Sequence, residues 1–248
     1  MRITDSTSLE GVTEQSFTCN DVPGVLFTPA DATGPRPLIV LGHGGGQHKR
    51  APGVVGPARH LVIAGGFAVV AMDAPGHGDR PQDETLARMA AENRAAMATG
   101  AEVAPRLAAL HTYLATTSVR EWKSVVSAVQ TQENVGEGPV GYRGLSMGCG
   151  LGVPFVASDP RVRAAVLGLC GPLGLEADAA RITVPVQFLV QWSDRFVPRE
   201  SALALYDAFA APVKTLHANP GDHGDVPRAE LDDALRFFQR HLTNRHSG

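Results

Sequence analysis

The chain has few cysteines and no long hydrophobic run. Its three cysteines are odd in number and widely spaced, and no C-x-x-C pair occurs, which argues against a disulfide framework and a zinc ribbon. No apolar stretch reaches the roughly 18 residues that a membrane-spanning helix needs. The opening segment, MRITDSTSLEG, is polar and lacks the apolar core of a signal peptide. We therefore expect a cytoplasmic protein with no membrane partner.

A strong charge of either sign is also missing. Lys and Arg total 22, Asp and Glu total 25, and the net charge is −3, so the basic field of a nucleic-acid-binding domain is absent. Apolar residues make up 44% and charged residues 19% of the 248 positions, which is typical of a globular domain and not of a disordered chain. No low-complexity linker divides the sequence. We expect a single domain over residues 1–248.

Short apolar segments alternate with longer stretches of helical character. The apolar runs are continuous, which is typical of strands buried on both faces of a parallel sheet. A hairpin is expected first, with strands at 12–19 and 24–28. The buried strands are expected at 38–41, 67–72, 139–142, 164–169 and 186–191, and a sixth strand with a weaker apolar pattern is expected at 213–216. The main helices are expected at 55–64, 103–130, 150–157, 200–210 and 228–242. This alternation predicts an α/β fold with a mostly parallel central sheet flanked by helices.

One connection is longer than a crossover requires. More than sixty residues separate the expected strands at 67–72 and 139–142, where a crossover needs about a dozen or more. Residues 83–97 have the pattern of an additional helix. We expect a small helical cap insertion at 79–110, after the second buried strand.

The pentapeptide GLSMG at residues 144–148 follows one expected strand and precedes an expected helix. It matches G-x-S-x-G, in which the serine occupies a strained strand-to-helix turn that lifts its hydroxyl above the sheet. The glycines are needed there because neighbouring backbone comes too close for a Cβ atom. Since the pattern also arises by chance in a glycine-rich chain, its placement between strand and helix carries the prediction that Ser146 is a nucleophile.

A nucleophilic serine needs a general base, and the base needs an orienting carboxylate. In this topology both come later in the chain, on loops at the carboxyl ends of later strands. Asp194 follows an expected strand and is predicted as the carboxylate; its alternative role is a helix cap or turn, and Glu200 is a poorer candidate. His223, in the loop GDHGD before the last helix, is predicted as the base, with His217 as its rival.

The segment GHGGG at 42–46 follows the first buried strand. An HGGG-type loop offers backbone N–H groups to a tetrahedral oxyanion. We predict the amides of Gly45 and Met147 as the donors, with Gly44 as the alternative to Gly45. A phosphate-binding loop is a poorer interpretation. The chain has no Gly-Lys-Ser/Thr, which a nucleotide P-loop needs, and Gln47 stands where a dinucleotide-binding fingerprint starting at Gly42 would have Gly or Ala. His43 is predicted to be a structural hydrogen-bonding residue.

Several residues are candidates for contacts with a substrate. Phe196 and Val197, together with Met147 and the helix at 83–97, are predicted to wall an apolar pocket, the alternative being core packing. For Arg143 and Arg195 we favour surface solvation over binding of an acidic substrate.

These residues, in this order, resemble the α/β-hydrolase superfamily over residues 38–242. The segment DAPGHG at 73–78 is similar to a loop of that superfamily, in which His77 would organise the loop. The small size and the HGGG loop look most like dienelactone-hydrolase-related esterases. The resemblance implies a Ser-His-Asp hydrolase that cleaves small-molecule carboxylic esters through an acyl-enzyme, with no metal and no organic cofactor. Dienelactone hydrolases themselves use cysteine, so Ser146 points to a serine carboxylesterase.

Two other classes of function stay open. Thioesterases, amidases, lyases and perhydrolases can use the same triad, because a fold does not determine a function. A binding protein without turnover is the second alternative, against which the intact triad argues. The natural ester and the oligomeric state do not follow from the sequence.

Overall fold

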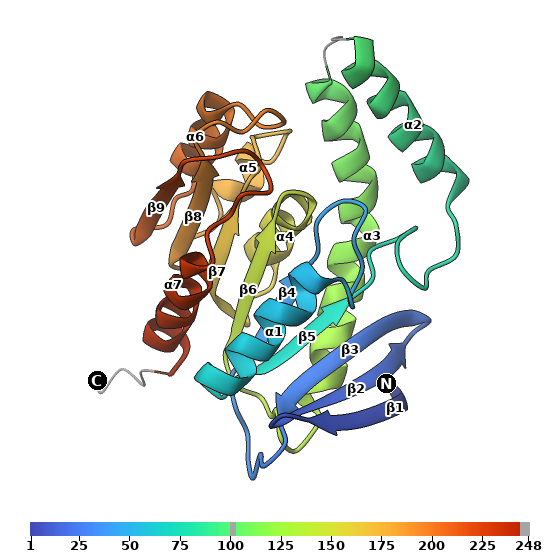
Figure 1. The fold of residues 1–248 in the computed structure, drawn as a ribbon, viewed down its shortest axis with the longest axis vertical. Coiled ribbons are helices and arrows are strands. Elements are labelled where there is room, and N and C mark those ends of the chain that lie inside the picture. Colours follow the sequence, from blue (N-terminus) through green and yellow to red (C-terminus); the bar gives the residue numbers. More distant parts are fainter. Residues whose placement is uncertain (100–102, 244–248) are drawn as a thin grey trace.

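A computed structural model describes residues 1–99 and 103–243 of the chain. The strands of the described chain form a nine-stranded sheet in the order β1-β2-β3-β5-β4-β6-β7-β8-β9 (Figure 1). They are β1 (Arg2–Leu9), β2 (Val12–Cys19), β3 (Val22–Pro29), β4 (Leu38–Gly42), β5 (Ala68–Met72), β6 (Val140–Leu145), β7 (Val162–Gly168), β8 (Val186–Gln191) and β9 (Lys214–Asn219). The first three strands pair in antiparallel fashion, and β4 to β9 run parallel to one another. The predicted mostly parallel sheet flanked by helices is confirmed.

Helices cover both faces of this sheet (Figure 1). They are α1 (Pro52–Gly65), α2 (Glu84–Thr99), α3 (Ala104–Gln130), α4 (Met147–Ser158), α5 (Glu176–Ala179), α6 (Arg199–Ala208), α7 (Ala229–Phe238) and a terminal π-helical turn (Gln239–Thr243). Successive side chains of a strand point to opposite faces. Ile39 and Leu41 therefore pack with α1 and α7, whereas Leu38 and Val40 join the cluster under α3, α4 and α6.

The helices begin and end where local chemistry allows. Helix α1 has proline at its first position, where the missing N–H is not needed, and ends at Gly66, whose φ is +67°. Helix α4 is apolar on all sides and nine of its residues are buried, because it packs between the sheet and α3. This buried helix gives the turn at its N-terminus a rigid support.

The extra length before β6 forms α2 and the start of α3, which lie side by side and project from the body of the molecule (Figure 1). Residues 100–102 of the expected insertion at 79–110 lie outside the described chain. The Tyr113 hydroxyl of α3 donates a hydrogen bond of 3.1 Å to Asp83, just before α2. That this segment acts as a cap, within one domain, stays a prediction.

Three details differ from the expectation. Strand β1 was not predicted, because all its residues are exposed and it has no apolar face to reveal it. The four-residue helix α5 was also not predicted. Strand β9 continues to Asn219, so His217 lies within the strand and not after it. Among the helices that the structure describes, none has the length and apolarity to cross a membrane.

Candidate active site

Ser146 lies in the sharp turn between β6 and α4. Its φ of +56° and ψ of −123° fall in a region that residues with a Cβ rarely adopt. The turn is held at both ends: the Ser146 amide donates to the carbonyl of Gly168 at 3.0 Å, and the Ser146 carbonyl accepts the amides of Cys149 and Gly150 at 2.9 and 3.1 Å. The surrounding backbone therefore maintains a strained conformation that exposes the hydroxyl at the edge of the sheet.

The glycines around Ser146 are required by close backbone contacts, as the motif predicts. A Cβ atom on Gly144 would lie 2.3 Å from the carbonyl oxygen of Gly148. A Cβ atom on Gly148 would lie 2.5 Å from the carbonyl oxygen of Gly42. Neither contact can be relieved by a side-chain rotation, because each neighbour is backbone. The turn thus packs directly against the end of β4.

A buried tyrosine that the sequence does not single out supports this turn. The Tyr142 hydroxyl donates a hydrogen bond of 2.5 Å to the carbonyl of Gly148, and the ring packs against Trp122 and Phe155. Burial raises the pKa of the Tyr142 hydroxyl well above its usual range. A tyrosine in a short buried strand looks like an ordinary core residue, so its role is visible only from the contact with Gly148.

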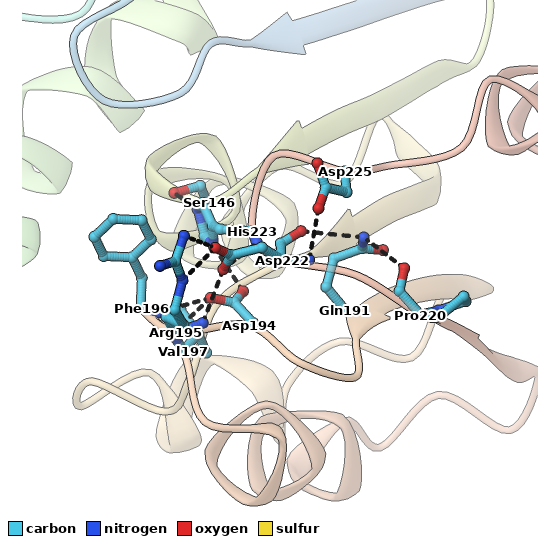
Figure 2. A network of polar contacts seen from close by, with 10 residues as sticks. All are labelled: Ser146, Gln191, Asp194, Arg195, Phe196, Val197, Pro220, Asp222, His223 and Asp225. Carbon is cyan, nitrogen blue, oxygen red and sulfur yellow. Dashed lines mark hydrogen bonds and ion pairs between the residues drawn. The ribbon is translucent and has the colours of Figure 1, made fainter.

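The structure brings Ser146, His223 and Asp194 together (Figure 2). The distance from His223 Nε2 to Ser146 Oγ is 2.9 Å, and that from His223 Nδ1 to Asp194 Oδ2 is 2.6 Å. The Asp194 side chain is 2% exposed, and its second oxygen accepts the amides of Phe196 and Val197 at 2.8 and 2.9 Å. With a proton on Nδ1 donated to the carboxylate, Nε2 offers its lone pair to the serine hydroxyl.

The rival candidates lie elsewhere. His217 Nδ1 is 2.8 Å from the buried carboxylate of Glu230 on α7. Glu200 is an exposed residue that pairs with Arg199 at 2.9 Å. Both side chains thus have partners outside the line of hydrogen bonds from Ser146 through His223 to Asp194. The geometry therefore distinguishes the predicted base and carboxylate from their alternatives.

The predicted oxyanion donors lie next to each other. A Cβ atom on Gly45 would be 4.0 Å from the Met147 Cβ atom. Met147 is the first residue of α4, where an amide has no acceptor within the helix. The alternative, Gly44, directs its amide to the Gln47 side chain at 3.4 Å. In the described chain the amides of Gly45 and Met147 have no such partner, which favours this pair.

His43 shapes the loop that carries Gly45. Its Nε2 atom accepts the amide of Ala74 at 3.0 Å, which leaves Nδ1 to donate to the Gly44 carbonyl at 2.9 Å. Burial lowers the pKa of the His43 imidazole, which favours the neutral ring that these two bonds require. His43 therefore has the geometry of a structural hydrogen-bonding residue.

A buried ion pair behind this loop is a second feature that the sequence does not reveal. Lys49 Nζ lies 2.6 Å from Asp73 Oδ2, and the Lys49 amide donates to Asp73 Oδ1 at 2.8 Å. Burial alone would raise the pKa of Asp73, but the hydrogen bonds from Lys49 and from the Asp79 amide together hold it below its usual range. A single lysine in a loop gives no sequence signal for this role.

The expected pocket residues have different environments. Phe196 is 61% exposed, and its ring centre lies 5.4 Å from that of His223 in an edge-to-face arrangement. Val197 is half-buried and packs against the core. Arg195 is exposed and pairs with Asp222. The expectation for Arg143 was wrong: its side chain is buried, because β6 is covered on that face, and burial lowers its pKa to about 10, partly opposed by Glu230.

The structure offers one group of potential metal ligands among the described residues, His217, Glu230 and Asp233, with ligand atoms within 4.8 Å of one another. Both Glu230 oxygens already accept hydrogen bonds, from His217 and Asn219, and Asp233 pairs with Arg236. The three cysteines are buried and free. That the protein uses no cofactor stays a prediction.

Comparison with known proteins adds independent information. Neither a protein-family model nor a curated protein matches the chain. Among solved structures, a cold-adapted esterase from an Arctic intertidal metagenomic library, in complex with PEG, is 30% identical, with a TM-score of 0.79 over 98% of this chain and 100% of that one. An acetyl xylan esterase from Thermoanaerobacterium is 20% identical, with a TM-score of 0.68 over 95% and 86% of the two chains. A Butyrivibrio proteoclasticus protein with bound ferulic acid is 14% identical, with a TM-score of 0.70 over 92% and 99%. The last two show a shared fold alone, whereas the first is also 30% identical to this chain over its whole length. The chain therefore belongs to the esterases of the α/β-hydrolase superfamily.

Proposed function

We propose that the protein is a serine carboxylesterase that hydrolyses small-molecule esters through an acyl-enzyme on Ser146. The observation that carries this proposal is the continuous line of hydrogen bonds from Ser146 Oγ to His223 and on to Asp194, with distances of 2.9 and 2.6 Å. A nucleophile, a base and an orienting carboxylate in this geometry are suited to acyl transfer.

In the first step, Ser146 Oγ attacks the ester carbonyl carbon while its proton moves to His223 Nε2. The carboxylate of Asp194 stabilises the positive imidazolium that results. The carbonyl oxygen becomes negative, and the amides of Gly45 and Met147 donate hydrogen bonds to it. Loss of one such donor typically costs about 3–4 kcal/mol of transition-state stabilisation.

In the second step, the tetrahedral intermediate collapses and its bond to the alkoxy oxygen breaks. His223 Nε2 returns the proton to the departing alcohol, and the acyl group stays on Ser146. His223 then takes a proton from water as that water attacks the acyl carbon, and the acid leaves as Ser146 regains its proton. Every proton is transferred through one imidazole nitrogen, which explains the need for a single, fixed ring orientation.

The cysteine chemistry of dienelactone hydrolases is poorly supported in this chain. Cys149 lies three residues after Ser146 but is completely buried. Burial raises the pKa of the Cys149 thiol well above its usual range, so the reactive thiolate is disfavoured. We therefore propose Ser146 as the nucleophile, with oxygen esters as the substrate class.

A panel of p-nitrophenyl esters of increasing acyl length, with a matched thioester and a matched anilide, tests this proposal. We expect the wild-type protein to favour an oxygen ester and Ser146→Ala to lower its hydrolysis by about 10⁴-fold or more. A preference for the thioester or the anilide would support the corresponding alternative reaction. Unchanged hydrolysis by Ser146→Ala would contradict the mechanism, and no turnover of any substrate by the wild type would support a binding protein.

A further inference from the structure

Two loops supply the partners of Ser146, and they are joined to each other along their length (Figure 2). We call residues 191–197 the acid loop and residues 220–225 the histidine loop. The Ser193 amide donates to the Gly221 carbonyl at 3.0 Å, and Gln191 Nε2 donates to the Asp222 carbonyl at 3.2 Å. The relative position of Asp194 and His223 therefore depends on contacts between these loops.

The side chain of Asp222 makes the largest set of these contacts. Its Oδ1 atom accepts the backbone amides of Arg195 at 3.0 Å and of His223 at 2.8 Å. Its Oδ2 atom accepts Arg195 Nε at 2.5 Å and also pairs with Arg195 Nη2. The Asp222 amide in turn donates to Asp225 Oδ2 at 2.9 Å, which holds the histidine loop in its own turn.

The two amides on Oδ1 belong to residues that matter for the triad. Arg195 directly follows Asp194, and His223 is the base itself. Asp222 Oδ1 thus connects the backbone next to Asp194 with the backbone of His223. We propose that Asp222 is a positioning residue that sets the hydrogen bond between Asp194 and His223, and that it acts through these two amides and not through its ion pair with Arg195. The proposal rests on the proposed function.

The physical reasons for preferring the amides are exposure and charge. The Arg195 side chain is 84% exposed, and exposed ion pairs contribute little because water screens them. Amide hydrogen bonds to a carboxylate are charge-assisted and directional, and here both restrain backbone. The pKa of Asp222 is lowered to about 2, first by the Arg195 amide, then by the Arg195 side chain and the His223 amide. The acceptor therefore keeps its charge over the whole range in which an esterase is assayed.

Three variants separate the two contributions. Asp222→Ala removes both oxygens, Asp222→Asn keeps one oxygen that can accept the two amides, and Arg195→Ala removes the ion pair alone. The matched control is Asp178→Asn, which removes the charge from another Asp–Arg pair, at 3.1 Å from Arg181. We expect Asp222→Ala to lower kcat about 10- to 100-fold with little change in KM, since small misplacements of a catalytic group have effects of this size. Arg195→Ala and the control should stay within about 3-fold of wild type. Asp222→Asn keeps an oxygen for the two amides but loses the charge that strengthens these bonds, so it should lose clearly less activity than Asp222→Ala.

A spectroscopic measurement distinguishes positioning from a general loss of stability. A short hydrogen bond from imidazole Nδ1–H to a carboxylate gives a far-downfield proton resonance. We expect this resonance in the wild type, in Asp222→Asn and in Arg195→Ala, and its loss in Asp222→Ala at temperatures where that variant is folded. A purely structural role would lower the thermal midpoint of Asp222→Ala and leave both kcat and the resonance unchanged, which would overturn the proposal.

The remaining outcomes are also decisive. If Arg195→Ala turns over its ester about 10-fold or more slowly than the wild type, the ion pair matters and the proposal is overturned, even if Asp222→Ala does not fold. If Ser146→Ala keeps wild-type activity, the proposed function fails whatever the Asp222 variants do. If Ser146→Ala is inactive and Asp222→Ala keeps its turnover rate and its resonance, only the role of Asp222 is refuted.

Discussion

The ammonium group of Lys49 lies 2.6 Å from the carboxylate of Asp73, and the two side chains are 6% and 0% exposed. Lys49 belongs to the loop after β4, which also carries Gly45, whereas Asp73 directly follows β5. The Asp73 carboxylate also accepts the Asp79 amide at 2.9 Å. This buried pair therefore joins two loops behind the proposed oxyanion donors.

Removal of the Lys49 charge is expected to be costly. Lys49→Met keeps the apolar stem but leaves the Asp73 carboxylate buried without its cation, so the free energy of unfolding should fall by about 3–5 kcal/mol. Urea denaturation measures this change. The control is Arg88→Met, which breaks an exposed pair with Glu92 and should cost about 0.5 kcal/mol or less. Equal effects of the two substitutions would contradict the structural role of Lys49.

The backbone of Ser146 predicts an unusual order of stability among its variants. Ser146→Gly and Ser146→Ala both remove the hydroxyl, but only glycine adopts the φ of +56° without strain. This strain costs a non-glycine residue about 1–3 kcal/mol. Glycine avoids it, but its greater conformational entropy in the unfolded chain offsets part of the gain. Ser146→Gly should therefore be more stable than Ser146→Ala by about 1 kcal/mol in chemical denaturation. An alanine variant of equal or higher stability would argue against a strained turn.

The contact between Gly148 and β4 is tested by adding a methyl group. In Gly148→Ala the new Cβ atom would lie 2.5 Å from the Gly42 carbonyl oxygen, so the serine turn must shift. We expect a loss of about 1–3 kcal/mol of stability together with a loss of esterase activity. Gly56→Ala, on α1, is the control, because its Cβ atom would meet nothing within 4 Å and should add about 0.5–1 kcal/mol of stability. Similar thermal midpoints for the two variants would contradict the packing described for the turn.

A buried histidine makes stability depend on pH. Burial lowers the pKa of His111 from 6.5 to about 4, so the folded protein holds the ring neutral where the unfolded chain binds a proton. The free energy of unfolding should therefore fall as the pH falls from about 6.5 to about 4. His43, whose pKa burial also lowers, acts in the same direction.

Thermal unfolding between about pH 7 and pH 4 of the wild type and of His111→Leu measures this contribution. The variant should lose less stability than the wild type over that range, because leucine cannot take up a proton. Parallel pH profiles for the two proteins would show that His111 is not held neutral by burial.

Local pattern predicted much of the fold. The run VQFLVQ has four apolar residues and follows Pro185, and β8 spans the same six residues that the sequence indicates. The eight residues of β1 are all exposed, so their place in the sheet depends on pairing with β2 and leaves no hydrophobic pattern. The weak apolar signal of β9 has a similar cause, since it is a sheet edge with several exposed residues.

The residues of the candidate site likewise fall into those that local sequence predicts and those that it does not. Ser146, Asp194 and His223 follow from a motif and from the order that the topology imposes. The roles of Lys49 and Asp222 depend instead on contacts with distant parts of the chain: Asp73 is 24 positions from Lys49, and Arg195 is 27 positions from Asp222. No local pattern encodes such contacts. The sequence therefore indicates the reacting groups more readily than the residues that hold them in place.

The most direct test of the mechanism is covalent labelling with a fluorophosphonate, followed by mass spectrometry of the digested protein. The probe reacts with a serine that is activated by a neighbouring base and has oxyanion donors within reach. We expect a single adduct on the peptide that contains Ser146, formed by the wild type and by Asp178→Asn, and strongly slowed in His223→Ala. An unlabelled protein, or an adduct on another residue, would contradict the assignment of Ser146 as the nucleophile.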